Sequence, residues 1–421
     1  MIDPFVLARS LHIAATALAS GTVFFTAFVA EPAAAATAPA SFPGLRERLK
    51  RLVWCALAVA VLSSGGWLLL VSAEILGVPV LDVGLHGGLW QVVTDTRFGL
   101  VWCVRLLLAV LLGMLLPWPR TGLLQSAAAA ALLGTLAFIG HAGAAPGVSG
   151  QVHLASDVLH SMAAGCWVGA LPALALLLDH ARRAKRETWD SVATSTVRRF
   201  SILGIVSVGT LFATGLVNGW NLLAEPRDLV VTDYGQLLLL KIGMFAAMVC
   251  IAAFNRFNLT PKLARPRAMQ ALERNAYIET GLGLCVIAVV GALGSMAPSV
   301  HNHVHPTTGP SPSGAAFVHI HSERAIAEVT IKPSQGGPAR ATIVLMREDF
   351  SPFTAKAVQF ELTSEVQRDV SAISRVATQR ADGAWEADTL EISQSGVWIV
   401  KLTIKADNGE PLVLDAPIVI D

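Results

Sequence analysis

The 421 residues are 53% hydrophobic and only 14% charged, and their mean hydropathy is +0.58. This balance excludes an ordinary water-soluble domain, so lipid must be the solvent for most of the chain. The net charge of +1 gives no reason to expect nucleic acid as a partner, because phosphate binding needs basic charge clustered toward one ligand surface. The five cysteines all lie in apolar stretches and indicate no disulfide framework.

Eight apolar runs are long enough to cross a hydrocarbon core of about 30 Å. They lie near residues 4–30, 52–76, 98–117, 122–140, 153–178, 200–223, 235–257 and 276–297. Each run is predicted to be a spanning helix, because a helix satisfies all of its own backbone groups in lipid. The first run is longer than the apolar core of a typical secretory signal, so we expect it to remain in the protein.

Basic residues alternate between the connections of these helices. Lys and Arg gather in the first, third, fifth and seventh connections and are almost absent from the others. Because cytoplasmic loops retain Lys and Arg, the alternation predicts that both termini lie outside the cytoplasm. An even number of spanning helices agrees with this orientation, because it leaves both termini on the same side of the membrane.

The composition changes after Pro298. Residues 1–300 are predicted to form the helical membrane domain, and residues 301–314 a linker rich in His, Pro, Gly and Ser. In residues 315–421, short segments alternate apolar with polar residues, which is typical of half-buried strands. We expect an all-β, immunoglobulin-like sandwich of about seven strands there.

Histidines accumulate on one side of the predicted membrane. Of the eleven, only His180 falls in a predicted cytoplasmic connection. Imidazole is the commonest side-chain ligand of zinc, copper and iron, so this distribution indicates that the protein binds a metal on the non-cytoplasmic side of the membrane.

The sharpest local pattern lies at the start of the fifth predicted helix. His153, Asp157 and His160 follow the spacing i, i+4, i+7 and therefore share one helix face. His160 and His12 of the first helix should both lie about 12 Å below the outer surface, where two inward imidazoles can hold a metal. The alternative is a structural ion pair between Asp157 and Lys241 that the histidines satisfy.

Two further patterns suit copper. Lys241, Met244 and Met248 share a helical face, and thioether sulfur is a soft ligand that could relay Cu(I) inward, although such methionines also fill cores. The external histidines His301, His303, His305, His319 and His321 have the i, i+2 spacing of a labile copper or zinc capture site. A solvated linker has the same spacing, so that alternative stays open for them.

Other intramembrane polar residues have no assigned role. We expect Glu279 and Arg256, near the inner ends of the last two helices, to form an ion pair. Arg105 and Asn218 either line a path or bind other polar groups. We find no arrangement of a nucleophile, a base and an orienting group of the kind that hydrolytic catalysis requires. We therefore do not expect an enzyme.

Several stretches, in order along the chain, resemble one known family. They are Gly140-His141-Ala142-Gly143 with Gln151-Val152-His153-Leu154-Ala155-Ser156-Asp157-Val158-Leu159-His160 and Ala163-Ala164-Gly165-Cys166-Trp167-Val168-Gly169-Ala170-Leu171-Pro172; Asn255-Arg256-Phe257-Asn258-Leu259-Thr260-Pro261; and Gly291-Ala292-Leu293-Gly294 with Ala297-Pro298 and His301. Together they resemble the CopD copper-resistance membrane proteins. The segment with His319-Ile320-His321 and Gly383-Ala384-Trp385 to Gly396-Val397-Trp398 is similar to the β domain that some members append.

The resemblance implies copper movement or handling in a bacterial inner membrane, with the β domain in the periplasm. It points to a functional polar set of His12, His141, His153, Asp157 and His160. We therefore predict a copper importer that captures the ion outside and binds it within the bundle. Its expected partners are copper, the lipid bilayer and a periplasmic copper-binding protein.

Two alternatives remain open at this stage. Paired inward histidines on separate helices also suit a b-type haem, which would make the protein an electron carrier. The chain could also deliver copper to a partner or assist an assembly step through its β domain.

Overall fold

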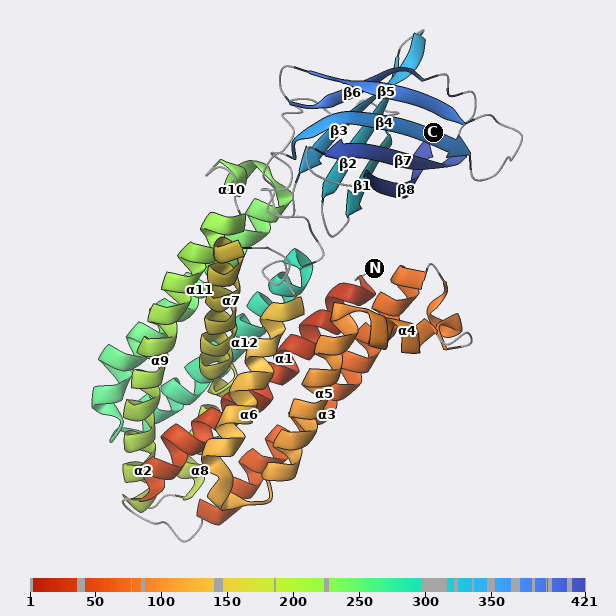
Figure 1. Cartoon of the computed structure of the whole chain (residues 1–421). Coiled ribbons are helices and arrows are strands. Elements are labelled where there is room, and N and C mark those ends of the chain that lie inside the picture. Colours follow the sequence, from red (N-terminus) through yellow and green to blue (C-terminus); the bar gives the residue numbers. More distant parts are fainter. Residues whose placement is uncertain are drawn as a thin grey trace. The chain divides into compact units, whose positions relative to one another are not determined.

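The computed structural model describes residues 3–35, 42–76, 78–84, 88–139, 147–184, 187–222, 227–294, 296, 316–321, 325–334, 337–346, 353–364, 372–380, 383–390, 392, 396–406 and 411–420. They form two compact units, the first from residues 1–144 and 148–304 and the second mainly from residues 305–421. The first unit is helical and the second is a β structure (Figure 1). Each unit is described by itself.

The helical unit consists mainly of long helices (Figure 1). In chain order its elements are α1 (Pro4–Phe24), η1 (Phe25–Ala30), α2 (Glu31–Ala35), α3 (Phe42–Leu76), η2 (Val80–Asp82), α4 (Gly88–Asp95), α5 (Arg97–Leu115), η3 (Pro119–Thr121), α6 (Gly122–Gly134), η4 (Thr135–Ile139), α7 (Gly147–Val168), α8 (Leu171–Ala184), α9 (Glu187–Leu222), α10 (Asp228–Val231), α11 (Asp233–Phe254), η6 (Asn255–Leu259), η7 (Thr260–Lys262) and α12 (Pro266–Leu293).

The eight predicted spanning helices are confirmed. Eight stretches of the described residues are helical, long enough and apolar enough to cross a membrane. Several helices extend beyond the apolar runs, because α3 and α9 begin in charged segments at Phe42 and Glu187 that remain helical. The position of the termini outside the cytoplasm stays a prediction.

The fifth predicted helix is interrupted. It is divided into α7 and α8 at Gly169 and Ala170, and Pro172 occupies the first turn of α8. Proline fits a first helical turn because its missing N–H has no intrahelical acceptor there. Gly169, at the interruption itself, lies at a close contact between helices.

Helix α1 packs against α3, α6, α8 and α12 and is the best buried span of the unit. Its Ala17 and Gly21 meet Gly165 of α7 and Gly169, which directly follows α7. A Cβ atom on Gly169 would lie 1.9 Å from the Ala17 carbonyl oxygen, and one on Gly21 would lie 2.4 Å from the Gly169 carbonyl carbon. These small residues, four apart on each helix, therefore allow the two backbones to touch, as is common in membrane bundles.

The second unit has eight antiparallel strands among its described residues, one more than expected. They are β1 (Ala316–His321), β2 (Ile326–Ser334), β3 (Gly337–Met346), β4 (Ala355–Ser364), β5 (Ile373–Gln379), β6 (Trp385–Leu390), β7 (Gly396–Ala406) and β8 (Leu412–Ile420). Neighbouring strands follow the order β1-β2-β3-β6-β5-β4-β7-β8, and β1 also packs against β8. The all-β class is confirmed, whereas the immunoglobulin-like arrangement is not.

Alternation builds the core of this unit. Val358, Phe360 and Leu362 of β4 are buried, and the intervening residues are more exposed. In the β4–β7 pairing Phe360 lies opposite Leu402, so inward side chains of both strands face the same core.

The contact between α1 and α7 gives the first testable prediction. Gly169→Ala should lower the thermal unfolding temperature of the purified protein, because overpacking of a tight contact costs about 1–3 kcal/mol. Gly243→Ala is the matched control, since an added Cβ on this α11 glycine meets nothing within 4 Å. Equal unfolding temperatures for the two variants would contradict the close approach.

Candidate functional site

The structure divides the predicted intramembrane residues between two polar clusters. The α1 cluster consists of His12, Thr16, Arg105 and Thr135, from α1, α5 and η4. The α7 cluster consists of His153, Asp157 and His160 of α7, Thr214 and Asn218 of α9, and Lys241 of α11. Among the described residues, no hydrogen bond or ring contact joins His12 to His160.

Both ring nitrogens of His12 are occupied. Its Nδ1 donates to the Ala60 carbonyl oxygen over 2.9 Å. Its Nε2 accepts from Arg105, 3.2 Å from Nε and 2.6 Å from Nη2. A carbonyl only accepts and a guanidinium only donates, so the imidazole is neutral, with its proton on Nδ1. Copper could bind His12 only if the Arg105 side chain moved away from Nε2.

Arg105 is an arginine surrounded by neutral acceptors. It is 2% exposed, and its Nη1 donates to the Leu132 carbonyl oxygen and to Thr135 Oγ1, at 3.2 and 2.7 Å. Its Nη2 also reaches Thr16 Oγ1 at 3.4 Å. Among the described residues it has no carboxylate partner. Its link to His12 was not predicted from the sequence, although an arginine inside an apolar run requires a buried acceptor.

His160 differs from His12 in the nitrogen that it leaves free. Its Nδ1 lies 2.9 Å from Thr214 Oγ1, and that hydroxyl donates to the Thr210 carbonyl oxygen over 2.6 Å. The hydroxyl proton is therefore committed, and Nδ1–H of His160 must donate to Thr214. The lone pair of Nε2 then has no partner among the described residues. A hydrogen bond on one ring nitrogen that orients the other toward a metal is typical of histidine ligands.

Asp157 lies between His153 and His160 on α7, and its side chain contacts α9. Its Oδ1 accepts from Asn218 Nδ2 over 3.2 Å. The carboxylate also interacts electrostatically with His153 and Lys241. Lys241 in turn interacts electrostatically with His160. Among the described residues no ion pair joins Asp157 to Lys241, so the structure shows an electrostatic interaction between them but not the ion pair that the sequence allowed as an alternative. Beside them stands the His160 imidazole, whose Nε2 has no partner among the described residues.

The described residues contain no group of three or more His, Cys, Asp or Glu side chains placed to hold one metal ion. The three side chains of α7 instead follow one another along the helix, at intervals of about 6 and 4.5 Å of rise. They can offer single ligands at successive depths.

The remaining predicted ligands are only partly described. His141, His301, His303 and His305 lie outside the described residues. His319 and His321 are on β1, with their backbone opposite Glu328 and Ile326 of β2. The external capture site therefore stays a prediction.

The predicted relay residues all lie on α11. Met248 is 1% exposed and belongs to the helical core that also contains Trp167 and Leu211. Met244 is partly buried, as is Lys241. The packing of Met248 is that of a core side chain, and a role in copper movement stays a prediction.

The predicted ion pair between Glu279 and Arg256 is wrong. Glu279 Oε1 accepts from Asn255 Nδ2 over 2.7 Å, whereas Arg256 donates to Ser201 Oγ and lies over the Phe257 ring. Asn255 and Arg256 are neighbours in the turn η6, but their side chains point in different directions. Asn255 points toward α12, and Arg256 points toward α9.

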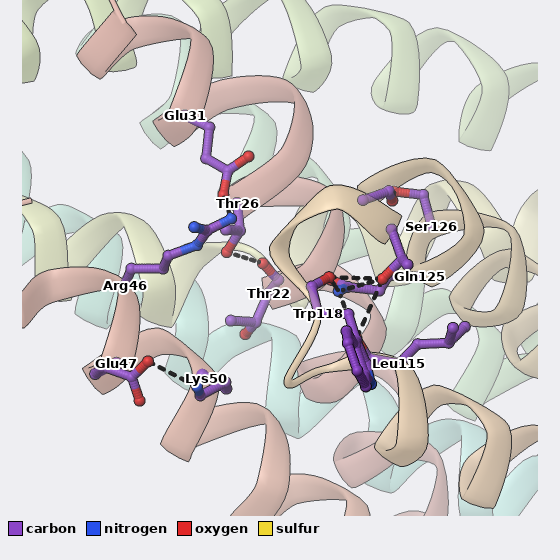
Figure 2. A network of polar contacts seen from close by, with 12 residues as sticks. Thr22, Thr26, Glu31, Arg46, Glu47, Lys50, Leu115, Trp118, Gln125 and Ser126 are labelled. Carbon is purple, nitrogen blue, oxygen red and sulfur yellow. Dashed lines mark hydrogen bonds and ion pairs between the residues drawn. The ribbon is translucent and has the colours of Figure 1, made fainter. Parts of the chain in front are cut away.

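A pocket of about 100 Å³, lined by apolar, polar and charged side chains, lies near the C-terminal end of α1. Figure 2 shows polar contacts of its lining residues. An ion pair between Glu31 and Arg46 joins α2 to α3 beside it, and Lys50 donates to Glu47 over 2.6 Å. Gln125 Nε2 donates to the Leu115 carbonyl oxygen over 2.9 Å. Charges of both signs line the pocket, so it does not select cations; the contacts hold the helix ends together.

The different contacts of His12 and His160 predict different losses in the free energy of unfolding when each histidine is replaced. His12→Phe should destabilise the purified protein by about 3 kcal/mol, because it leaves a buried guanidinium short of an acceptor. His160→Phe removes one hydrogen bond between neutral groups and should cost only about 1 kcal/mol. Chemical unfolding in detergent compares the two variants. A smaller loss of unfolding free energy in His12→Phe than in His160→Phe would contradict the assigned contacts.

Comparison with known proteins places this arrangement in a family. Residues 1–151 match the family described as Copper resistance protein D-like, N-terminal domain, and residues 194–293 match the family Copper resistance protein D. The chain is 32% identical over 226 residues to Copper resistance protein D of Pseudomonas syringae pv. tomato, which covers 50% of this chain and 72% of the relative.

Two further relatives extend the match. Copper transport protein CutJ of Bacillus subtilis (strain 168) is 26% identical over 417 residues, 94% of this chain and 70% of the relative. Inner membrane protein YebZ of Escherichia coli (strain K12) is 29% identical over 259 residues, 60% of this chain and 87% of the relative. The chain therefore belongs to the copper resistance protein D family, as its motifs indicated.

Proposed function

We propose that this protein moves copper across the bacterial inner membrane toward the cytoplasm and that the α7 cluster binds the ion on the way. The observation that carries the proposal is Nε2 of His160, which has no partner among the described residues, while Nδ1 of the same ring is bound to Thr214. Membership in a copper resistance family and similarity to a relative named as a copper transport protein support copper as the cargo.

The spacing of the α7 side chains suits an ion that must leave as well as enter. His153 is nearest to the start of α7, Asp157 follows one turn later and His160 about one turn after that. Conduction needs binding strong enough for entry but divided over several sites for exit. An imidazole, a carboxylate and a second imidazole at successive depths fulfil that requirement better than one closed cage.

The charges near this path favour a cation at the α7 cluster over the α1 cluster. Asp157 contributes a carboxylate to the α7 cluster, and Lys241 interacts with it electrostatically. At the α1 cluster, the Arg105 guanidinium occupies the ligand atom of His12 and would repel a cation. We therefore assign His12 to the structure of the α1 cluster in the state described here.

The periplasmic part of the proposal concerns the external histidines. His301, His303, His305, His319 and His321 would capture copper, and His141 would lie near the entrance. Both termini and the β domain would then lie in the periplasm, which agrees with the orientation predicted from the alternation of basic residues. A periplasmic copper-binding protein would be the donor, and no catalytic reaction is proposed.

A b-type haem is not favoured by these contacts. Haem ligation by His12 and His160 would need Nε2 of both rings, and Arg105 occupies one of them. A visible spectrum of the purified protein without a Soret band is the expected result. A Soret band lost in His160→Ala would favour the haem function instead.

Copper uptake by cells tests the pathway. His160→Ala should reduce the initial uptake rate at least about tenfold, because it removes the unoccupied nitrogen ligand. Leu159→Ala is the control, since Leu159 is the adjacent residue on the exposed face of α7. Uptake that is unchanged in His160→Ala, at equal amounts of protein in the membrane, would overturn the proposal.

The hydroxyl of Thr214 provides a subtler test. Thr214→Val keeps the shape of the side chain but removes the acceptor that orients His160. We expect the affinity for Cu(I) to fall about tenfold, at the lower end of the 10–100-fold range typical of such outer partners. Titration against a chromophoric Cu(I) chelator measures it. An unchanged affinity of Thr214→Val for Cu(I) would show that Thr214 does not contribute to copper binding.

A further inference from the structure

Glu279 of α12 is a carboxyl group inside the helical unit that the proposed copper path does not use. It is 2% exposed. Asn275 Nδ2 donates to Asn255 Oδ1 over 2.7 Å, and Asn255 Nδ2 donates to Glu279 Oε1 over 2.7 Å. These bonds fix the orientation of the Asn255 amide and join α12 to the π-helical turn η6.

The basic side chains of the elements packed against α12 are engaged elsewhere. Arg256 of η6 donates to Ser201, and Arg182 of α8 pairs with Asp179 and Glu273 at 3.0 Å each. Among the described residues, Glu279 has no ion-pair partner.

Arg183 of α8 also pairs with Asp179, at 2.8 Å. Two further cations, Lys241 and Arg9, lie elsewhere in the unit. Lys241 lies 14 residues before Asn255 on α11, about 21 Å away along the axis. Arg9 of α1 lies over the Trp67 ring, 5.1 Å from its centroid. Neither can neutralise a carboxylate at position 279, so the Asn255 amide is the only described group that stabilises it.

An ionised carboxylate in such surroundings is costly, and the group avoids the cost by keeping its proton. Protonated, Glu279 is neutral, and one of its oxygens can still accept the bond from Asn255. Carboxyl groups buried in membrane bundles commonly serve as proton relays.

The position of Asn255 connects this carboxyl group to the face of α11 that carries the methionines. Met244, Met248 and Asn255 follow spacings of four and seven residues and therefore share that face. A cation that moves inward along it approaches Glu279. Its positive charge stabilises the carboxylate, because the two charges attract each other in a low dielectric.

We infer that Glu279 is a proton-binding site that releases its proton when Cu(I) enters the inner half of the bundle. The O–H bond of the carboxyl group breaks, the proton leaves to solvent, and the electron pair stays on the carboxylate. Copper keeps its oxidation state, and the charge within the membrane is unchanged. The coupling to copper rests on the proposed function, whereas the protonated state of Glu279 does not.

Infrared spectroscopy of the purified full-length protein at neutral pH tests the protonated state. The carboxylic acid C=O band should be present in the wild type and lost in Glu279→Gln. Glu273→Gln is the matched control, because Glu273 lies on the same helix but pairs with Arg182 and contributes no acid band. Gln is the closest neutral mimic of a protonated Glu, so Glu279→Gln should unfold at the wild-type temperature. A band that survives in Glu279→Gln, or is absent from the wild type, would overturn the inference.

Proton release on addition of Cu(I), supplied as its acetonitrile complex, tests the coupling. In weak buffer with a pH dye, the wild type and Glu273→Gln should release about one proton more per bound ion than Glu279→Gln. Equal release by all three would overturn the coupling. If the wild type bound no copper, the proposed function and the coupling would both fail, and the infrared band would still decide the state of Glu279.

Discussion

A polar side chain inside a helical bundle must find its partner within the protein, because lipid supplies none. This constraint organises the interior of the protein. His12 is held between a carbonyl group and a guanidinium, Asp157 accepts from an amide and faces a lysine, and Glu279 accepts from Asn255. Against this background, an imidazole nitrogen without a partner is informative, and Nε2 of His160 is such an atom among the described residues.

Helix packing determines which groups can meet. Gly165 of α7 and Gly169, which directly follows α7, contact α1 through backbone atoms, so this side of α7 is closed to ligands. Asp157 and His160 project to another side, toward α9, where Thr214 and Asn218 receive them. His12 and His160, for which the sequence predicted an equal depth, therefore have different partners. Arg105 then defines the chemistry of the α1 cluster, and Thr214 that of the α7 cluster.

Periodicity and charge alone were sufficient to predict the eight spanning helices and the all-β domain, since both signals are repeated over many residues. The shared face of His153, Asp157 and His160 also follows from helical spacing. Contacts between helices distant in sequence do not. The donors to His12 come from Arg105, 93 residues away, and nothing in the sequence places Arg256 on Ser201 rather than on Glu279. The eighth strand was missed because short alternating segments carry a weak signal.

The central claim is that copper is bound by His160 and not by His12, and X-ray absorption spectroscopy of the Cu(I)-loaded protein tests it most directly. Imidazole scattering around copper should be present in the wild type, retained in His12→Gln and lost or strongly reduced in His160→Gln. Retention of the full imidazole signal in His160→Gln, with its loss in His12→Gln, would contradict the account.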